Sequence, residues 1–148
     1  MTVVAAVDDS DRAPTVLSYA SSLAADLGEP LHALYVLRRA DLVDILEKEV
    51  EGQAFTDNYE VKRAGEDIVR NAVVAERVEH DEAAIESVVR VGDPADEITS
   101  YADEIDARYI VIGGRRRTPT GKALFGSVTQ RVMLSASVPV LNVPTDSQ

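Results

Sequence analysis

The sequence predicts an α/β fold in which helices cover both faces of an open parallel sheet. Two observations carry this prediction: five short apolar segments are typical of strands, and segments with helical periodicity alternate with them. Such alternation implies parallel strands joined by right-handed crossovers. In chain order, the predicted strands are Val3–Val7, Leu31–Leu37, Ile85–Val91, Tyr109–Ile112 and Val138–Val143.

The helix after the first strand has clear boundary signals. Asp11 is placed to cap it, and Pro14 falls in its first turn, where a backbone N–H needs no partner. Gly28 stands where a helix commonly ends. The expected buried face consists of Val16, Ala20, Leu23, Ala24 and Leu27.

The region between the second and third strands is less regular. Residues 38–56 show little pattern apart from a short helical segment at Leu42–Leu46. A long helix is predicted from Thr56, because apolar residues then recur at spacings of three and four. Its expected buried positions are Val61, Ala64, Ile68, Ala72 and Ala75.

Two further helices are predicted, one before and one after the fourth strand. Asp93 is expected to cap the first, with Pro94 at its first position. The second begins at Gly126–Ser127, where either residue can act as the cap. The expected buried stripe of the first helix is Ile98, Tyr101, Ala102 and Ile105.

The candidate site lies between the fourth strand and the last helix. The strand is expected to stop at Gly113–Gly114, and open α/β sheets bind ligands at such strand ends. The free N–H groups and the dipole of a helix that begins at Gly126–Ser127 make an anion site. Glycines at both ends of the loop let phosphates approach the backbone. Gly113–Gly114 could instead serve only a turn, and Asp8 could simply begin an Asx turn.

Length and composition limit the class of protein. The 148 residues are expected to form one domain, residues 1–148, and the absence of cysteine excludes a disulfide framework or a thiolate metal site. The sequence contains no apolar run near the roughly 20 residues of a membrane span, and its first residues lack the basic region of a signal peptide. We therefore expect a soluble, cytoplasmic protein.

The net charge of −11 argues against nucleic acid and membranes as partners, because a repulsive field precedes any contact. Of the 15 basic residues only Lys48, Lys62 and Lys122 are lysines. An acidic, lysine-poor composition is also compatible with a halophile-like surface that stays soluble at high salt.

Common catalytic motifs are missing from the sequence. The segment Gly121–Lys122 lacks the upstream glycine and the hydroxyl residue of a P-loop. There is no dinucleotide fingerprint, nucleophile elbow or cysteine nucleophile. His32 and His80 have no metal-binding spacing, so we expect structural or exposed histidines. No catalytic residues are therefore predicted.

The chain resembles the universal stress protein family nearly from end to end. The segments that carry the resemblance are VVAAVDDS, LHALYVL, GDPADEI, GSVTQRV and VPVLNV. The nucleotide-binding branch of the family has the marker G-x2-G-x9-G-[ST]. Gly113 and Gly126–Ser127 match the first and last positions with the spacing intact, while Arg116 replaces the second glycine.

This resemblance implies a flavodoxin-like sheet with strand order 3-2-1-4-5 and an adenine nucleotide, ATP, across the ends of strands one and four. By position, Asp8 would face the adenosine and the backbone of Val36 would meet the adenine edge. Ile112 belongs to the same binding set. The remaining implied contacts, to ribose and phosphates, are Gly113, Gly126, Ser127 and Val128.

The arginine run Arg115–Arg117 beside this site has three interpretations. Arg115 and Arg116 could contact phosphates, because a guanidinium offers a planar fork to phosphate oxygens. Alternatively, the run is a solvated loop, or the long side chain of Arg116 fills the channel that glycine would leave open.

Three functions remain compatible with the sequence. The first is a non-catalytic, dimeric stress-response module that binds ATP and signals its occupancy to a protein partner of unknown identity. The second is a slow nucleotide phosphohydrolase in which Asp8 and Asp9 hold a divalent metal such as Mg²⁺. The third is a family member that has lost nucleotide binding. A homodimer is expected through the apolar edge segment Val138–Val143.

Overall fold

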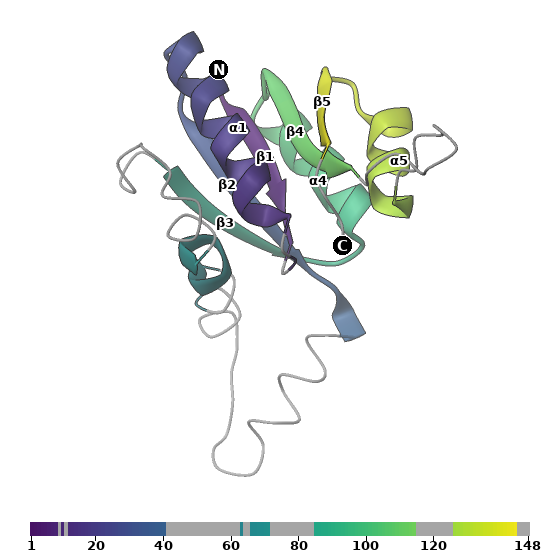
Figure 1. Ribbon diagram of the computed structural model, residues 1–148. Helices are drawn as coiled ribbons and strands as arrows, with labels where there is room; N and C mark the ends of the chain where they lie inside the picture. The colour runs from purple at the N-terminus through teal and green to yellow at the C-terminus, as the bar shows by residue number, and fades with distance from the viewer. Residues whose placement is uncertain are drawn as a thin grey trace, which may run out of the picture.

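The computed structural model describes residues 1–8, 10, 12–40, 63, 66–71, 85–114 and 126–144. Within this part of the chain, five parallel strands form one sheet in the order β3-β2-β1-β4-β5, which confirms the predicted fold class and strand order (Figure 1). The strands are β1 (Val3–Val7), β2 (Leu31–Leu37), β3 (Ile85–Val91), β4 (Tyr109–Gly114) and β5 (Val140–Pro144).

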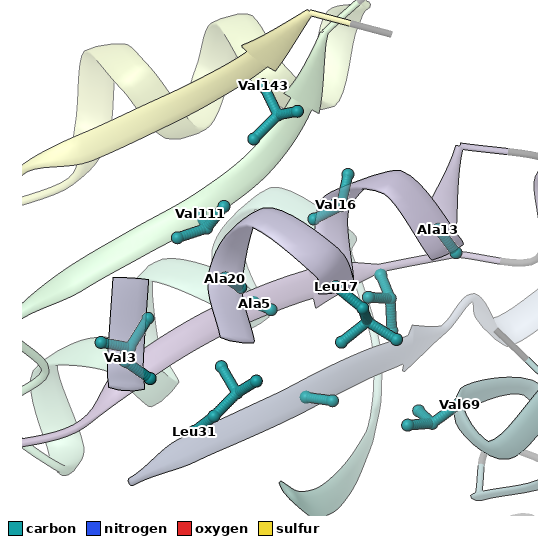
Figure 2. Packing of buried hydrophobic residues seen from close by; sticks show 13 residues of the cluster. Val3, Ala5, Ala13, Val16, Leu17, Ala20, Leu31, Val69, Val111 and Val143 are labelled. Carbon is teal, nitrogen blue, oxygen red and sulfur yellow. The ribbon is translucent and has the colours of Figure 1, made fainter. Parts of the chain in front are cut away.

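Helices cover both faces of the sheet, as predicted. Helix α1 (Ala13–Leu27) lies on one face, and α4 (Pro94–Glu104) and α5 (Ser127–Ser135) lie on the other (Figure 1). Because β1 is sandwiched between these layers, its successive side chains enter two different cores: Val3 packs with α1 and Val4 with α4. Figure 2 shows the first of these cores, including the α1 residues Val16, Leu17 and Ala20. Burial on both faces explains why the central strands read as continuous apolar runs.

The boundaries of α1 agree with the sequence at its end and differ at its start. Gly28 has φ of 66°, a left-handed conformation that glycine adopts without strain, and its N–H bonds to carbonyls of the last turn. At the start, the cap position belongs to Arg12, which makes no capping bond with its side chain. Asp11, the predicted cap, lies outside the described residues. The predicted face is buried or partly buried at all five positions.

The segment between β2 and β3 is described only in part. Residues 63 and 66–71 are helical, which agrees with the long helix predicted here, whereas Leu42–Leu46 lies outside the described residues. Val69 is 2% exposed and belongs to the core beneath α1, while Ile68 is only partly buried. The predicted buried stripe was therefore wrong at Ile68, because the helix faces the core with Val69 instead.

The start of α4 is built as predicted. The carboxylate of Asp93 accepts a hydrogen bond from the backbone N–H of Asp96 at 3.1 Å, and the predicted stripe packs into the second core. His32 is structural, since its ring nitrogens lie 2.7 Å from the Tyr101 hydroxyl and 2.9 Å from the Glu86 carboxylate. None of the described helices has both the length and the apolar character needed to cross a bilayer.

The last two strands differ from their predicted limits. Strand β4 continues through Gly113 and Gly114, which pair with Val143 and Pro144 of β5, so the interpretation of these glycines as a turn was wrong. A side chain at Gly114 would collide with the Asn142 amide, which explains the need for glycine. Strand β5 begins at Val140 rather than Val138, because Pro139 has no N–H for the ladder. It forms an edge of the sheet, as predicted.

Candidate functional site

A pocket of about 420 Å³ opens at the carboxyl ends of β1, β2 and β4, next to the starts of α1 and α5. Topology explains its position, since parallel strands end at a common edge and the helices begin there. Every predicted site residue that the structure describes lines this pocket. These residues are Asp8, Val36, Ile112, Gly113, Gly126, Ser127 and Val128. The two predicted arginines, Arg115 and Arg116, lie outside the described residues.

The start of α5 forms one end of the pocket. Gly126 is the cap residue, with φ of −64° and ψ of 160°, and Ser127 is the first helical residue. Gly126 has no side chain that could cap this helix, no other described side chain does so, and the first turn contains no acidic residue. The first N–H groups of a helix have no partner within the helix. This end of the pocket therefore offers backbone donors and a positive dipole to an anion.

A buried threonine holds α5 against β4. Thr129 is 5% exposed, and its hydroxyl donates to the carbonyl oxygen of Gly113 at 2.9 Å. This bond fixes the distance between the end of β4 and the first turn of α5, which together form the proposed anion end. Thr129 was not among the predicted site residues. Its only signal was its position as the third residue of the helix.

At the end of β1, Asp8 is held by residues that follow it. One carboxylate oxygen accepts hydrogen bonds from the backbone N–H of Ser10, at 3.0 Å, and from the Ser10 hydroxyl. The other oxygen lies 3.8 Å from the Arg12 guanidinium. The bond to the N–H two residues onward is an Asx turn, so this interpretation of Asp8 is confirmed. Asp8 lines the pocket as well, and the two roles are compatible.

Apolar side chains form the wall between these polar ends. Val36 and Ile112 come from the ends of β2 and β4, and Leu34 and Ile98 contribute to the same surface. An apolar wall beside a few fixed polar groups is the usual composition of a small-molecule site. It suits a flat, largely apolar ring system better than a fully charged ligand.

The charge of the pocket is opposite to that of the whole chain. The charged residues in its described lining are two arginines, Arg12 and Arg38, and one carboxylate, Asp8. Arg38 makes no side-chain hydrogen bond or ion pair with any described residue. In a protein with a net charge of −11, the described lining of this pocket therefore carries more positive than negative groups. Neither arginine was predicted. Arg12 could have been suspected as the residue four places after Asp8, and Arg38 as the first residue beyond β2.

A metal centre finds little support here. The described residues contain no cluster of three or more His, Cys, Asp or Glu side chains that could hold a metal ion. Asp8 already accepts bonds from Ser10, and Asp9, its proposed partner ligand, lies outside the described residues.

Comparison with known proteins identifies relatives that match nearly the whole length of this chain. The model of the universal stress protein family matches residues 1–144. Universal stress protein YxiE of Bacillus subtilis is 28% identical, over 95% of this chain and 97% of that protein. A universal stress protein of Archaeoglobus fulgidus in complex with dAMP is 29% identical, covers 96% of each chain and superposes with a TM-score of 0.58.

A second solved structure, a universal stress protein in complex with cAMP, is 26% identical and superposes with a TM-score of 0.63. That match covers 98% of this chain and 97% of the other. Some structural relatives of this fold therefore bind adenine nucleotides. The chain belongs to the universal stress protein family.

Proposed function

We propose that this protein binds an adenine nucleotide, ATP, in the pocket and acts as a stress-response module without strong catalytic activity. The observation that carries the proposal is the uncapped start of α5, which faces a pocket with an apolar wall and a local excess of positive charge. The relatives in complex with dAMP and cAMP support an adenine nucleotide as the ligand class.

In this proposal, each end of the pocket binds a different part of the nucleotide. The adenine lies against the apolar wall, with its edge at the backbone of Val36, and Asp8 faces the adenosine. The phosphates rest on the backbone of Gly126, Ser127 and Val128 beside Gly113, where glycine keeps the approach open. Arg115 and Arg116 follow β4 in the sequence and are proposed to contact the same phosphates.

Hydrolysis would need a positioned water or metal in addition to this binding geometry. The hypothesis of a metal held by Asp8 and Asp9 gains nothing from the described contacts, because Asp8 is engaged by Ser10 and lies near Arg12. Binding, with Mg²⁺ carried by the nucleotide itself, is therefore the function proposed.

The test is calorimetric titration of ATP into the wild type and Gly126→Val at fixed salt. The φ and ψ angles of Gly126 are ones that any residue can adopt, so valine should be tolerated in the fold. The branched side chain of valine would, however, crowd the phosphates. We expect affinity to fall by about tenfold or more, about 1.4 kcal/mol. Ala25→Val, on the exposed face of α1, is the control and should bind like the wild type. Unchanged affinity in folded Gly126→Val, or no ATP binding by the wild type, would contradict the proposal.

We also propose that the protein is a homodimer through the segment Val138–Val143. Strand β5 forms a sheet edge, and its Leu141 side chain is 42% exposed. An apolar edge of this kind pairs readily with its counterpart across a two-fold axis. Leu141→Lys should shift the protein toward monomer in sedimentation velocity, whereas Tyr19→Lys, an exposed site on α1, should not. A Leu141→Lys protein that still sediments as a dimer would place the interface elsewhere.

A further inference from the structure

A second pocket, of about 690 Å³, adjoins the first on the side of α4. The two pockets share Arg38, Pro94, Ser127 and Val128, so they form one continuous cleft. Ser127 and Val128 belong to the proposed phosphate end of the nucleotide site. A group attached to the terminal phosphate of a bound nucleotide would therefore extend into this second pocket.

One wall of the second pocket is fixed by an ion-pair network between two helices. The Arg131 guanidinium lies 3.1 and 3.2 Å from the two carboxylate oxygens of Asp93 and 3.2 Å from Asp96. The hydrogen bond from the backbone N–H of Asp96, together with Arg131, holds the pKa of Asp93 below its usual range. These three side chains satisfy one another, so the wall needs no ligand.

The other charged groups of this pocket are not satisfied in the same way. The side chains of Arg38, Arg39 and Glu97 make no hydrogen bond or ion pair with the residues that the structure describes. Glu97 is partly buried, and its side chain passes beside Gly92, where an added Cβ would lie 3.1 Å from the Glu97 Cγ. Partial burial of a carboxylate is costly unless a donor reaches it. A ligand that brings both hydroxyl donors and phosphate oxygens would satisfy all three side chains.

We propose that the second pocket binds the distal sugar of a nucleotide whose diphosphate carries a second polyhydroxy group, as in ADP-ribose. Glu97 accepts hydrogen bonds from the sugar hydroxyls, Arg39 donates to the oxygens of the same sugar, and Arg38, which lines both pockets, lies against the diphosphate. The proposal rests on the proposed nucleotide site, because the ADP half must occupy the first pocket. It adds a ligand class and residues that the nucleotide site alone does not use.

Calorimetric titration with ADP and ADP-ribose at one salt concentration tests this proposal. We expect the wild type to bind ADP-ribose about tenfold more tightly than ADP. ADP-ribose carries less negative charge than ADP, so a general attraction to positive charge cannot produce this gain. Glu97→Gln and Arg39→Gln should each remove most of the gain while changing the affinity for ADP by less than about twofold. Asp26→Asn, an exposed change on α1, is the control and should keep the gain.

The outcomes separate the two proposals. Equal affinities for ADP and ADP-ribose would overturn the second pocket and leave the nucleotide site standing. No binding of either ligand would overturn both. A gain that persists in Glu97→Gln and Arg39→Gln would overturn the assignment of these residues. Thermal unfolding checks that each variant is folded. If Glu97→Gln does not fold, Arg39→Gln alone provides the test.

Discussion

The starts of α4 and α5 lie on the same face of the sheet and are built in opposite ways. At α4, the Asp93 carboxylate accepts a backbone N–H, and Asp96 and Glu97 add negative charge to the first turn. At α5, the cap residue is Gly126, and the first turn has neither a capping side chain nor an acidic residue. The protein therefore satisfies one helix start with its own carboxylates and leaves the other without one.

In the two helix starts, one backbone feature serves two purposes. Free N–H groups and a positive dipole occur at every helix start. Where a side chain satisfies them, they stabilise the fold, as at α4. At α5 they face a pocket beside a strand end that contains glycine, and there we propose that they bind a ligand. We therefore expect that a capping carboxylate introduced at the start of α5 will stabilise the helix and weaken ligand binding.

Gly126→Asp gives α5 a start like that of α4 and should have the largest effect. The new carboxylate would accept the free N–H groups and repel the phosphates, so ATP affinity should fall by about a hundredfold, about 2.7 kcal/mol. The temperature of unfolding should stay the same or rise, because the helix gains a cap. Calorimetry and thermal unfolding measure the two effects.

Ser22→Asp is the matched control for this variant, because it adds the same charge on the exposed face of α1. It should change ATP affinity far less. If Gly126→Asp folds and binds ATP as the wild type does, the start of α5 is not the phosphate site.

Arg116, which replaces the second marker glycine, is a second difference between the two helix starts. Basic residues precede α5, whereas acidic residues begin α4. If Arg116 clamps a phosphate, Arg116→Ala should weaken ATP binding by at least about 1.5 kcal/mol, roughly tenfold, and adenosine binding much less. If Arg116 fills the channel instead, Arg116→Gly should strengthen ATP binding. We expect the first result. ATP affinity that is identical in all three proteins at fixed salt would reject both roles.

Asp93→Asn tests the α4 side and should have the smallest effect. Asparagine is also a good cap, so this change isolates the charge of Asp93. The pKa of Asp93 is lowered in the folded protein, chiefly by the N–H of Asp96 and then by Arg131. Its charge therefore stabilises the fold above the pKa that Asp93 has in the unfolded chain, and this contribution is lost as pH falls through the native pKa.

We expect Asp93→Asn to unfold at a lower temperature than the wild type at neutral pH, and the difference to close as the pH is lowered. Thermal unfolding across this pH range is the measurement, with Asp26→Asn as the control for a lost surface charge. A difference that stays constant with pH would show that the charge of Asp93 does not contribute.

Local signals made much of this site predictable from the sequence. Gly126–Ser127 precedes an apolar pair at helical spacing, so the start of α5 was placed correctly. The strand ends converge because alternating strands and helices force a parallel sheet, which brings Asp8, Val36 and Gly113 to one pocket. These inferences needed only residues close together in the chain and a rule of topology.

The errors and omissions involve contacts between segments that are distant in sequence. Gly113 and Gly114 resemble a turn until their pairing with β5 is known, and Ile68 rather than Val69 fits the helical periodicity. The hydrogen bond from Thr129 to Gly113 depends on how closely α5 packs on β4. Such details are decided by packing between distant segments, which local sequence patterns do not specify.

The most direct test of the central claim is an NMR titration that follows individual backbone amides. We predict that ATP shifts the amide signals of Ser127 and Val128 strongly, and that adenosine, which lacks phosphates, shifts them much less. The amide of Asp96, already bonded to Asp93, should move little with either ligand. If ATP binds while the amides of Ser127 and Val128 stay in place, the phosphates do not lie at the start of α5, and the account is wrong.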